Sequence, residues 1–354
     1  IFDRCRWNAM PIEHETRDGA LVWIRNPVTG VISYVVDVRA KSFAFTLGRE
    51  AGNSVRAAPI SEEQVSRATA NCPFCPGNEA LTTGEIFRVT PAEMPGWTGG
   101  AARGGDGWVV RVFNNLFPRI PAELTGNRNE SYIVVEDPRH FVDNPQAHGD
   151  LIFTGALGEE HFFHLLQADV RVMRLARENR AVRAVVIRKN QGRESGASQP
   201  HLHQQILGSP EPFPSVAAEA RAERETPGLF EEIINLMDRL GLTIESRGNI
   251  ISYASPIGAF PRSYDVVMHQ YRDAQLPELS IGELREFASA IYRILALMGP
   301  LPLDYEIHQG EGLPLHAHIN ARMYPYSNVA GTLNLPNTLL ASAAAIREAL
   351  GRRA

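Results

Sequence analysis

The sequence predicts an α+β protein built from two similar halves, residues 1–210 and 211–354, whose antiparallel sheets carry flanking helices. Two observations predict this fold. Each half contains a strand, an amphipathic helix and then paired strands, an order that closes a small layered unit. Each half also ends this pattern with two histidines separated by one residue, His201 with His203 and His316 with His318. The repeat therefore predicts two units with combined sheets.

The individual elements follow from hydrophobic periodicity and turn residues. Apolar runs at 21–24 and 31–36 flank an Asn-Pro-Val-Thr-Gly turn, which predicts a β-hairpin. Helical spacing of apolar residues predicts helices at 158–180, 215–241 and 281–298. Strands are expected at 108–113, 131–135, 184–188, 249–253, 265–268, 304–308 and 315–323. Prolines at positions 210, 212 and 214 forbid continuous regular structure and separate the halves.

Composition excludes several classes of partner. A hydrophobic content of 44% and a charged content of 21% are typical of a soluble globular protein. The net charge of -5 gives no broad basic surface for nucleic acid or an anionic membrane, so phosphate binding must be local. Because there is no signal-peptide pattern and no apolar run near eighteen residues, we expect a cytoplasmic protein with no membrane partner.

The stretch from Asn190 to Gln205 carries the strongest functional signal. Residues at i and i+2 of a strand share a face, so His201, His203 and Gln205 form one polar row. The preceding loop is rich in Gly, Ser and Asn and supplies backbone N–H groups that suit a phosphate. A single His-x-His is more often a strand with solvated histidines. The loop, the amide and the second histidine pair together favour phosphate chemistry.

A Cys-x-x-Cys motif predicts a metal site. Cys72 and Cys75 bracket Pro73-Phe74 in a tight knuckle that can aim two thiolates at one tetrahedral ion. The motif alone leaves zinc and redox roles open, but Pro-Gly-Asn directly after it favours a knuckle over a redox helix. With three cysteines in the chain, a metal or redox role in a reducing compartment is favoured over a disulfide framework.

These motifs resemble the galactose-1-phosphate uridylyltransferase branch of the histidine-triad superfamily. The resemblance rests on the segments 198–205, 72–78 and 111–115, which occur in the family's order. It implies a duplicated histidine-triad-like fold, in which one chain does what a dimer of smaller histidine-triad proteins does. It also implies that the chain forms a homodimer.

The resemblance assigns roles to individual residues. His203 is the implied nucleophile, which attacks the α-phosphorus of a nucleotide and forms a nucleotidyl-histidine. Gln205, also catalytic, donates a hydrogen bond to a non-bridging phosphate oxygen. The free ring nitrogen of His203 is expected to donate to a backbone carbonyl that fixes its tautomer. The implied nucleotide- and phosphate-binding residues are Arg39, Asn115, Asn190, Ser198 and Gln205.

Two metal sites are implied by the same resemblance. A structural zinc ion anchors the strand of the nucleophile and does no Lewis-acid chemistry. Its expected ligands are Cys72, Cys75, His140 and His201, with His148 as the alternative to His140. A second ion, iron or zinc, is implied at Glu219, His308, His316 and His318, although surface or core histidines would leave the same letters.

The leading hypothesis is a ping-pong nucleotidyltransferase of the hexose-1-phosphate uridylyltransferase type. It would move UMP from a nucleotide sugar to a phosphorylated acceptor such as a sugar 1-phosphate. One alternative is a phosphorylase that cleaves a nucleotide sugar, such as ADP-glucose, or a dinucleoside polyphosphate. Another is a non-catalytic nucleotide-binding protein. Leu333 stands where the family has a sugar-gripping glutamate, and it cannot accept a hydrogen bond, so acceptor preference should differ.

Overall fold

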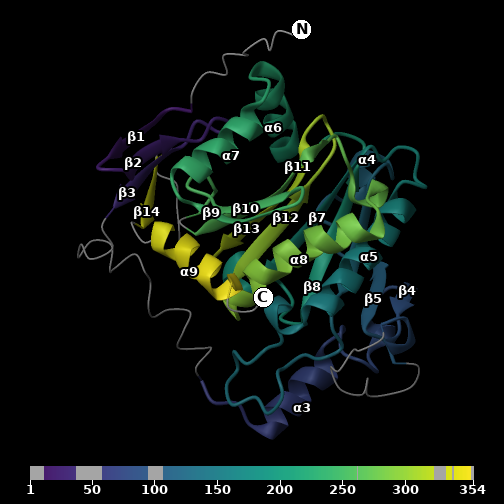
Figure 1. The fold of residues 1–354 in the computed structure, drawn as a ribbon. Coiled ribbons are helices and arrows are strands. Elements are labelled where there is room, and N and C mark those ends of the chain that lie inside the picture. The colour runs from purple at the N-terminus through teal and green to yellow at the C-terminus, as the bar shows by residue number, and fades with distance from the viewer. Residues whose placement is uncertain are drawn as a thin grey trace.

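The computed structural model describes residues 12–36, 58–94, 107–260, 262–322, 332–336 and 339–351. Within these ranges the strands form a ten-stranded sheet and a four-stranded sheet (Figure 1). Neighbouring strands of the larger sheet all pair antiparallel. The predicted α+β class is confirmed.

The larger sheet consists of two five-stranded halves in mirrored order, β4-β5-β6-β8-β7 followed by β12-β13-β11-β10-β9. The first half comprises β4 (Glu85–Val89), β5 (Val110–Asn114), β6 (Glu130–Val135), β7 (Ala184–Gln191) and β8 (His203–Ser209). The second comprises β9 (Thr243–Arg247), β10 (Ile250–Ala254), β11 (Ser263–Arg272), β12 (Leu303–His308) and β13 (Pro314–Ala321). The halves meet where β7 pairs with β12, which we call the central seam.

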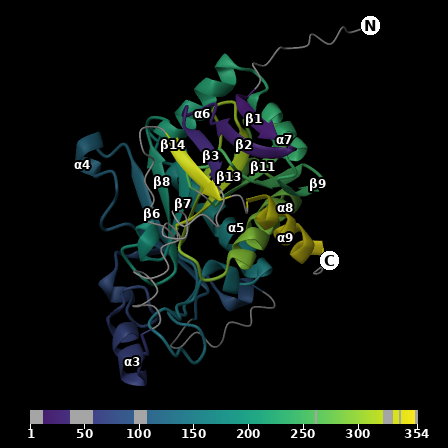
Figure 2. The ribbon, with the colours of Figure 1, turned by 90° about the vertical axis from the view of Figure 1, so that its left-hand side faces the viewer.

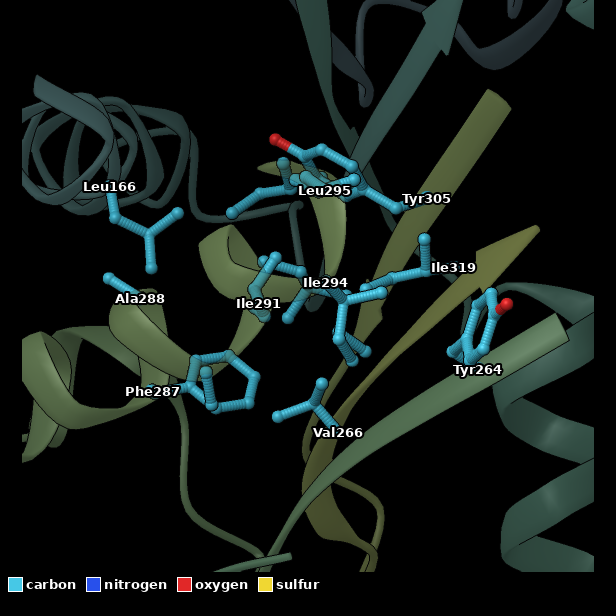
Figure 3. Close-up of a cluster of buried hydrophobic side chains, with 14 of the residues drawn as sticks. Leu166, Tyr264, Val266, Phe287, Ala288, Ile291, Ile294, Leu295, Tyr305 and Ile319 are labelled. Carbon is cyan, nitrogen blue, oxygen red and sulfur yellow. The ribbon is translucent and has the colours of Figure 1, made fainter. Parts of the chain in front are cut away.

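Equivalent helices connect the strands in each half. The helix α5 (Glu159–Ala176) joins β6 to β7, and α8 (Ile281–Met298) joins β11 to β12. A capping box opens α8, because the Ser280 hydroxyl accepts from the backbone N–H of Glu283. Figure 3 shows Ile291 and Ile294 of α8 packed near Ile319 of β13, and all three are fully buried. The two predicted helices at 158–180 and 281–298 are confirmed, and they cover one face of the sheet.

The prediction that residues 215–241 are helical is confirmed for most of the stretch. The structure has two helices there, α6 (Pro214–Glu225) and α7 (Leu229–Arg239). Gly228 lies between them with a φ of 88°, a conformation that glycine adopts without strain. The Glu223 carboxylate accepts from the backbone N–H groups of Gly228 and Phe230 at 2.9 and 3.2 Å, so it satisfies donors at the start of α7.

The smaller sheet joins the beginning and the end of the chain. It contains β1 (His14–Arg17), β2 (Ala20–Arg25), β3 (Ile32–Val36) and β14 (Thr332–Pro336), and β14 pairs parallel with β3 (Figure 2). The predicted hairpin is confirmed as β2 and β3, whose register pairs Trp23 with Tyr34. In the turn, the side chain of Asn26 accepts from the backbone N–H groups of Val28 and Thr29.

The remaining elements are short or peripheral. They are α3 (Glu62–Asn71), α4 (Ala122–Thr125), α9 (Leu339–Gly351) and the 3-10 turns η1 (Glu79–Leu81), η2 (Pro91–Glu93), η3 (Thr154–Ala156), η4 (Arg193–Ser195) and η5 (Leu276–Glu278). Among the helices described, none combines the length and the apolar character needed to cross a bilayer.

Candidate active site and metal centres

The face of the large sheet opposite α5 and α8 carries a continuous row of polar side chains. Residues that pair directly across antiparallel strands share a face and lie about 4.5–5.5 Å apart at Cβ. The row begins at β8 and crosses the central seam into the second half. Its members, in strand order, are Gln205, Arg188, Glu306, His318 and Asp265.

Four of the predicted metal ligands meet at one end of this face. Cys72 and Cys75 follow α3, His140 follows β6 and His201 precedes β8. All four are buried, and their ligand atoms lie within 4.8 Å of one another. The Sγ of Cys75 lies 3.4 Å from the Nδ1 atoms of both histidines. Metal bonds of about 2.0–2.3 Å at tetrahedral angles separate ligands by roughly 3.3–3.8 Å, and the three sulfur–nitrogen distances of 3.4–3.6 Å lie in this range, so the set is compatible with a tetrahedral metal ion. His148, the alternative ligand, is not in the cluster.

Hydrogen bonds prepare this cluster for a cation. The Nε2 of His201 donates to the backbone oxygen of Asp137 at 2.8 Å, which leaves Nδ1 facing the sulfurs. A hydrogen bond from Cys75 lowers the pKa of the Cys72 thiol, and the same bond raises the pKa of Cys75. A bound zinc ion would stabilise both as thiolates.

One ring nitrogen of His203 is hydrogen-bonded, and the other has no hydrogen bond to a residue in the described part of the chain. Its Nδ1 donates to the backbone oxygen of His201 at 2.8 Å, so the lone pair of the neutral ring is on Nε2. The Phe74 ring meets it edge-on with centroids 5.1 Å apart. Only 6% of the residue is exposed, and burial lowers the pKa of His203 to about 4. A pKa in this range leaves the ring uncharged at neutral pH.

Two predicted phosphate contacts lie near His203. Gln205 is two residues further along β8 and therefore on the same face. Asn190 lies near the end of β7, where its side-chain oxygen accepts from the Nε of Arg188 at 3.1 Å. Its amide nitrogen donates to the backbone oxygen of Ser195 in the glycine-rich loop. The loop is thereby tied to the polar face.

The other predicted nucleotide contacts are less directly placed. Asn115 follows β5, and its side chain bonds the backbone N–H of Phe117 at 3.0 Å and the hydroxyl of Ser131 at 3.2 Å. Ser198 is exposed in the loop before β8. No hydrogen bond links either residue to His203 or Gln205 within the described ranges. Arg39 lies outside those ranges.

The second predicted cluster also assembles. Glu219 of α6 reaches the Nδ1 of His308 at 2.7 Å, the Nε2 of His316 at 3.3 Å and the Nε2 of His318 at 3.0 Å. The Nδ1 of His316 donates to the backbone oxygen of Pro314 at 2.7 Å. Its Nε2 is buried and, although 3.3 Å from Glu219, makes no hydrogen bond of good geometry with a described residue, which is costly unless a ligand binds there. The set therefore fits a metal ion.

Neighbouring charges shift the pKa values of residues in the second cluster. Burial alone would raise the pKa of Glu219, but His308 and His316 hold it well below the usual value. Burial would likewise lower the pKa of His318, yet the carboxylate of Asp265, 2.6 Å from its Nδ1, raises that pKa well above normal. A carboxylate thus fixes the ring of His318 from behind, as outer-shell partners of metal-binding histidines do.

The sequence reasoning missed a polar network on the helix side of β8. The Gln204 amide donates to the Asp169 carboxylate at 2.5 Å and accepts from the Tyr305 hydroxyl at 2.6 Å. Lys189 and Glu136 form a fully buried ion pair nearby. Burial raises the pKa of Asp169 well above its usual value. The sequence signal for this network was the presence of Lys189 and Gln204 inside otherwise apolar strand segments.

Arg188 and Glu306 on the polar face were also missed. Their alternation with Asn190 and His308 along β7 and β12 indicated which residues share a face. Leu333, the expected replacement for a sugar-gripping residue, lies buried in β14 opposite Ser33, with 2% exposure. Its side chain packs in the core.

Comparisons with known proteins agree with this architecture. A family model described as a domain of unknown function (DUF4921) matches residues 125–300. An ADP-glucose phosphorylase from Arabidopsis thaliana is 26% identical over 181 residues, which cover 46% of this chain and 43% of that enzyme. The alignment thus spans less than half of the length of this relative.

Solved structures match over almost the whole chain. A crystal structure of an ADP-glucose phosphorylase from Arabidopsis thaliana with bound ADP-glucose has a TM-score of 0.64 at 18% identity, covering 92% of this chain and 97% of that one. A uridylyltransferase structure has a TM-score of 0.60 at 21% identity, covering 93% and 98%. The predicted resemblance is therefore confirmed at the level of the fold: the chain shares the fold of the ADP-glucose phosphorylase and uridylyltransferase structures.

Proposed function

We propose that this protein is a nucleotidyltransferase that carries a nucleoside monophosphate covalently on His203. One observation carries the proposal. The imidazole is neutral, and its Nδ1 is bound to the His201 carbonyl, which leaves the Nε2 lone pair free beside Gln205. A histidine that only packs in the fold does not require a fixed tautomer, whereas a nucleophile beside a loop that supplies N–H groups to a phosphate does.

The reaction proceeds in two displacements. In the first, the Nε2 lone pair bonds to the α-phosphorus, and the bond from that phosphorus to the bridging oxygen breaks, which releases a phosphorylated leaving group. In the second, a phosphate oxygen of the acceptor attacks the same phosphorus and expels the imidazole. The Gln205 amide and the N–H groups of the loop stabilise the charge on the non-bridging oxygens. Asn190 and Ser198 would hold phosphate oxygens, and Asn115 and Arg39 would contact the nucleotide.

Two metal ions would organise the site. A zinc ion held by Cys72, Cys75, His140 and His201 would supply a rigid anchor rather than chemistry at phosphorus. A second ion, iron or zinc, would be held by Glu219, His308, His316 and His318 and would tie α6 to β12 and β13. The chain's own contribution is to hold the strand of His203 in one position, because the His201 carbonyl orients the nucleophile.

The donor and acceptor define two versions of this proposal. In the first, UMP moves between a nucleotide sugar and a sugar 1-phosphate. In the second, the enzyme is a phosphorylase that releases ADP from ADP-glucose with inorganic phosphate. The relative named above as an ADP-glucose phosphorylase supports the second version. The burial of Leu333 also supports it, because this residue offers no hydrogen bond to a sugar acceptor.

A donor panel tests the proposal. The protein is incubated with UDP-glucose, ADP-glucose or diadenosine tetraphosphate, each with inorganic phosphate or galactose 1-phosphate, and products are separated by ion-exchange chromatography. We expect turnover of at least one pair and its loss in His203→Asn. Turnover that survives in this variant would contradict the proposal. Turnover of ADP-glucose with phosphate, but not of UDP-glucose with galactose 1-phosphate, would select the phosphorylase version.

The predicted homodimer and cytoplasmic location stay predictions. Light scattering coupled to size-exclusion chromatography measures the first directly, and a mass of one chain would contradict it.

A further inference from the structure

Arg188 occupies the centre of the polar face, next to the proposed nucleophile. It pairs across β7 and β8 with Gln205, and their side chains therefore share a face. His203 is two residues from Gln205 on β8, a diagonal position roughly 7–8 Å from Arg188. An extended arginine side chain and one phosphate group together can span this distance. Arg188 can therefore contact a phosphate attached to, or displaced from, the α-phosphorus.

The guanidinium of Arg188 is oriented by two neighbouring side chains and remains partly exposed. Its Nε donates to the side chain of Asn190 at 3.1 Å, and its Nη1 lies 3.4 Å from the carboxylate of Glu306. The Nη2 atom has no hydrogen bond to any residue in the described ranges. The side chain of Arg188 is 29% exposed, so a ligand can reach it. Asn190 thus orients the planar group without covering it.

Glu306 is a shared counter-ion rather than a dedicated partner. Its second carboxylate oxygen lies 3.3 Å from the Nε2 of His308, a residue of the second metal cluster. Because Glu306 also contacts His308, a phosphate can bind the guanidinium of Arg188 without leaving the carboxylate of Glu306 unpaired.

We propose that Arg188 binds the second phosphate of the reaction, meaning the leaving phosphate of the first displacement and the acceptor phosphate of the second. This inference rests on the proposed function and deepens it, because it places the acceptor site at the central seam. Arginine suits this task, since its planar fork binds phosphate oxygens in pairs. The ligand class is a phosphate monoester or inorganic phosphate, and Arg188 does not distinguish the two.

Binding measurements test this role apart from turnover. In a His203→Asn background, which blocks transfer, calorimetry measures the affinities of ADP-glucose and UDP-glucose against those of AMP and UMP. We expect Arg188→Met to weaken the binding of the nucleotide sugar about 10- to 100-fold, the loss typical of a charged hydrogen bond. The affinity for the monophosphate should change less than about twofold, because it lacks the second phosphate.

Two control variants separate phosphate binding from a structural ion pair. Glu306→Gln removes the same ion pair but keeps the guanidinium, so binding should be unchanged or tighter. Arg183→Met removes an exposed arginine just before β7 and should have no effect. If Glu306→Gln weakens the binding of the nucleotide sugar as much as Arg188→Met does, the ion pair is structural and the inference is wrong. Equal losses for sugar and monophosphate, or no loss, would also overturn it.

A second titration identifies the source of the phosphate. With AMP or UMP saturating, inorganic phosphate and glucose 1-phosphate are titrated separately into the proteins with and without Arg188. Loss of binding of either one in Arg188→Met supports the inference, and the phosphate that binds names the acceptor. If neither binding is affected, the inference fails. If the protein with Arg188 intact binds no nucleotide at all, the proposed function itself is what fails.

Discussion

The Nδ1 of His203 lies 2.8 Å from the backbone oxygen of His201. One residue of the first metal cluster therefore orients the proposed nucleophile through its carbonyl group, while its ring faces Cys72 and Cys75. His201 lies two residues before His203, just outside β8, so the metal ligand and the proposed nucleophile are neighbours along the chain. Metal binding and nucleophile geometry should consequently be coupled.

Loss of a thiolate should remove the first ion. We expect Cys75→Ser to lower the zinc content by about one equivalent and to destabilise the fold by about 3 kcal/mol or more, since metal binding stabilises only the folded state. Elemental analysis and thermal denaturation measure both effects. Cys5→Ser changes the one cysteine outside the motif and is the control. Full zinc content in Cys75→Ser would contradict the assigned ligand set.

The second cluster should lose its ion independently. Glu219 supplies the only carboxylate in the second set of ligands among the described residues. Glu219→Gln should therefore lower the affinity for the second metal by at least about tenfold, while the first zinc ion stays bound. Elemental analysis after dialysis against a weak chelator measures this. Glu225→Gln, at an exposed position near the end of the same helix, should retain both metals. If the parent protein and both variants each hold one metal ion per chain, the second cluster binds no metal.

The buried carboxyl of Asp169 should make stability depend on pH. Burial raises its pKa in the folded state above the unfolded value. Its stabilising contribution is therefore fully present below the unfolded pKa of about 3.9 and is lost as pH rises through the folded pKa. Asp169→Asn imitates the protonated acid and keeps the oxygen that accepts from Gln204.

We expect Asp169→Asn to match the parent protein near pH 4 and to exceed it by about 1–3 kcal/mol at pH 8, the range for a buried polar group without a partner. Urea unfolding at the two pH values measures the difference. A variant that is less stable than the parent at pH 8 would show that the ionised form of Asp169 is the one stabilised by the fold.

The sequence predicted the parts of the fold that depend on local patterns. The helix at 281–298 appeared with its expected bounds because its apolar spacing and the cap at Ser280 agree. The break at Gly228 was missed, since the apolar spacing continues through it and only the Pro-Gly pair signals the turn. Both metal clusters were predicted from the resemblance, and the structure brings each set together.

The polar row could not be predicted because it depends on strand register. Arg188 and Glu306 are 118 positions apart in the sequence, and only the pairing of β7 with β12 brings them together. A shift of one residue in that pairing would place each side chain on the opposite face. The same argument applies to Gln204, whose partners come from α5 and β12.

Direct detection of the covalent intermediate tests the central claim. The protein is mixed briefly with ADP-glucose or UDP-glucose without an acceptor phosphate, quenched with base and digested for peptide mass spectrometry, because phosphoramidates survive base and are cleaved by acid. We predict a nucleoside monophosphate on the peptide that contains His203, with fragment ions locating it on that ring, and its removal by inorganic phosphate or a sugar 1-phosphate. An adduct on another residue, or turnover with no adduct at His203, would contradict the account.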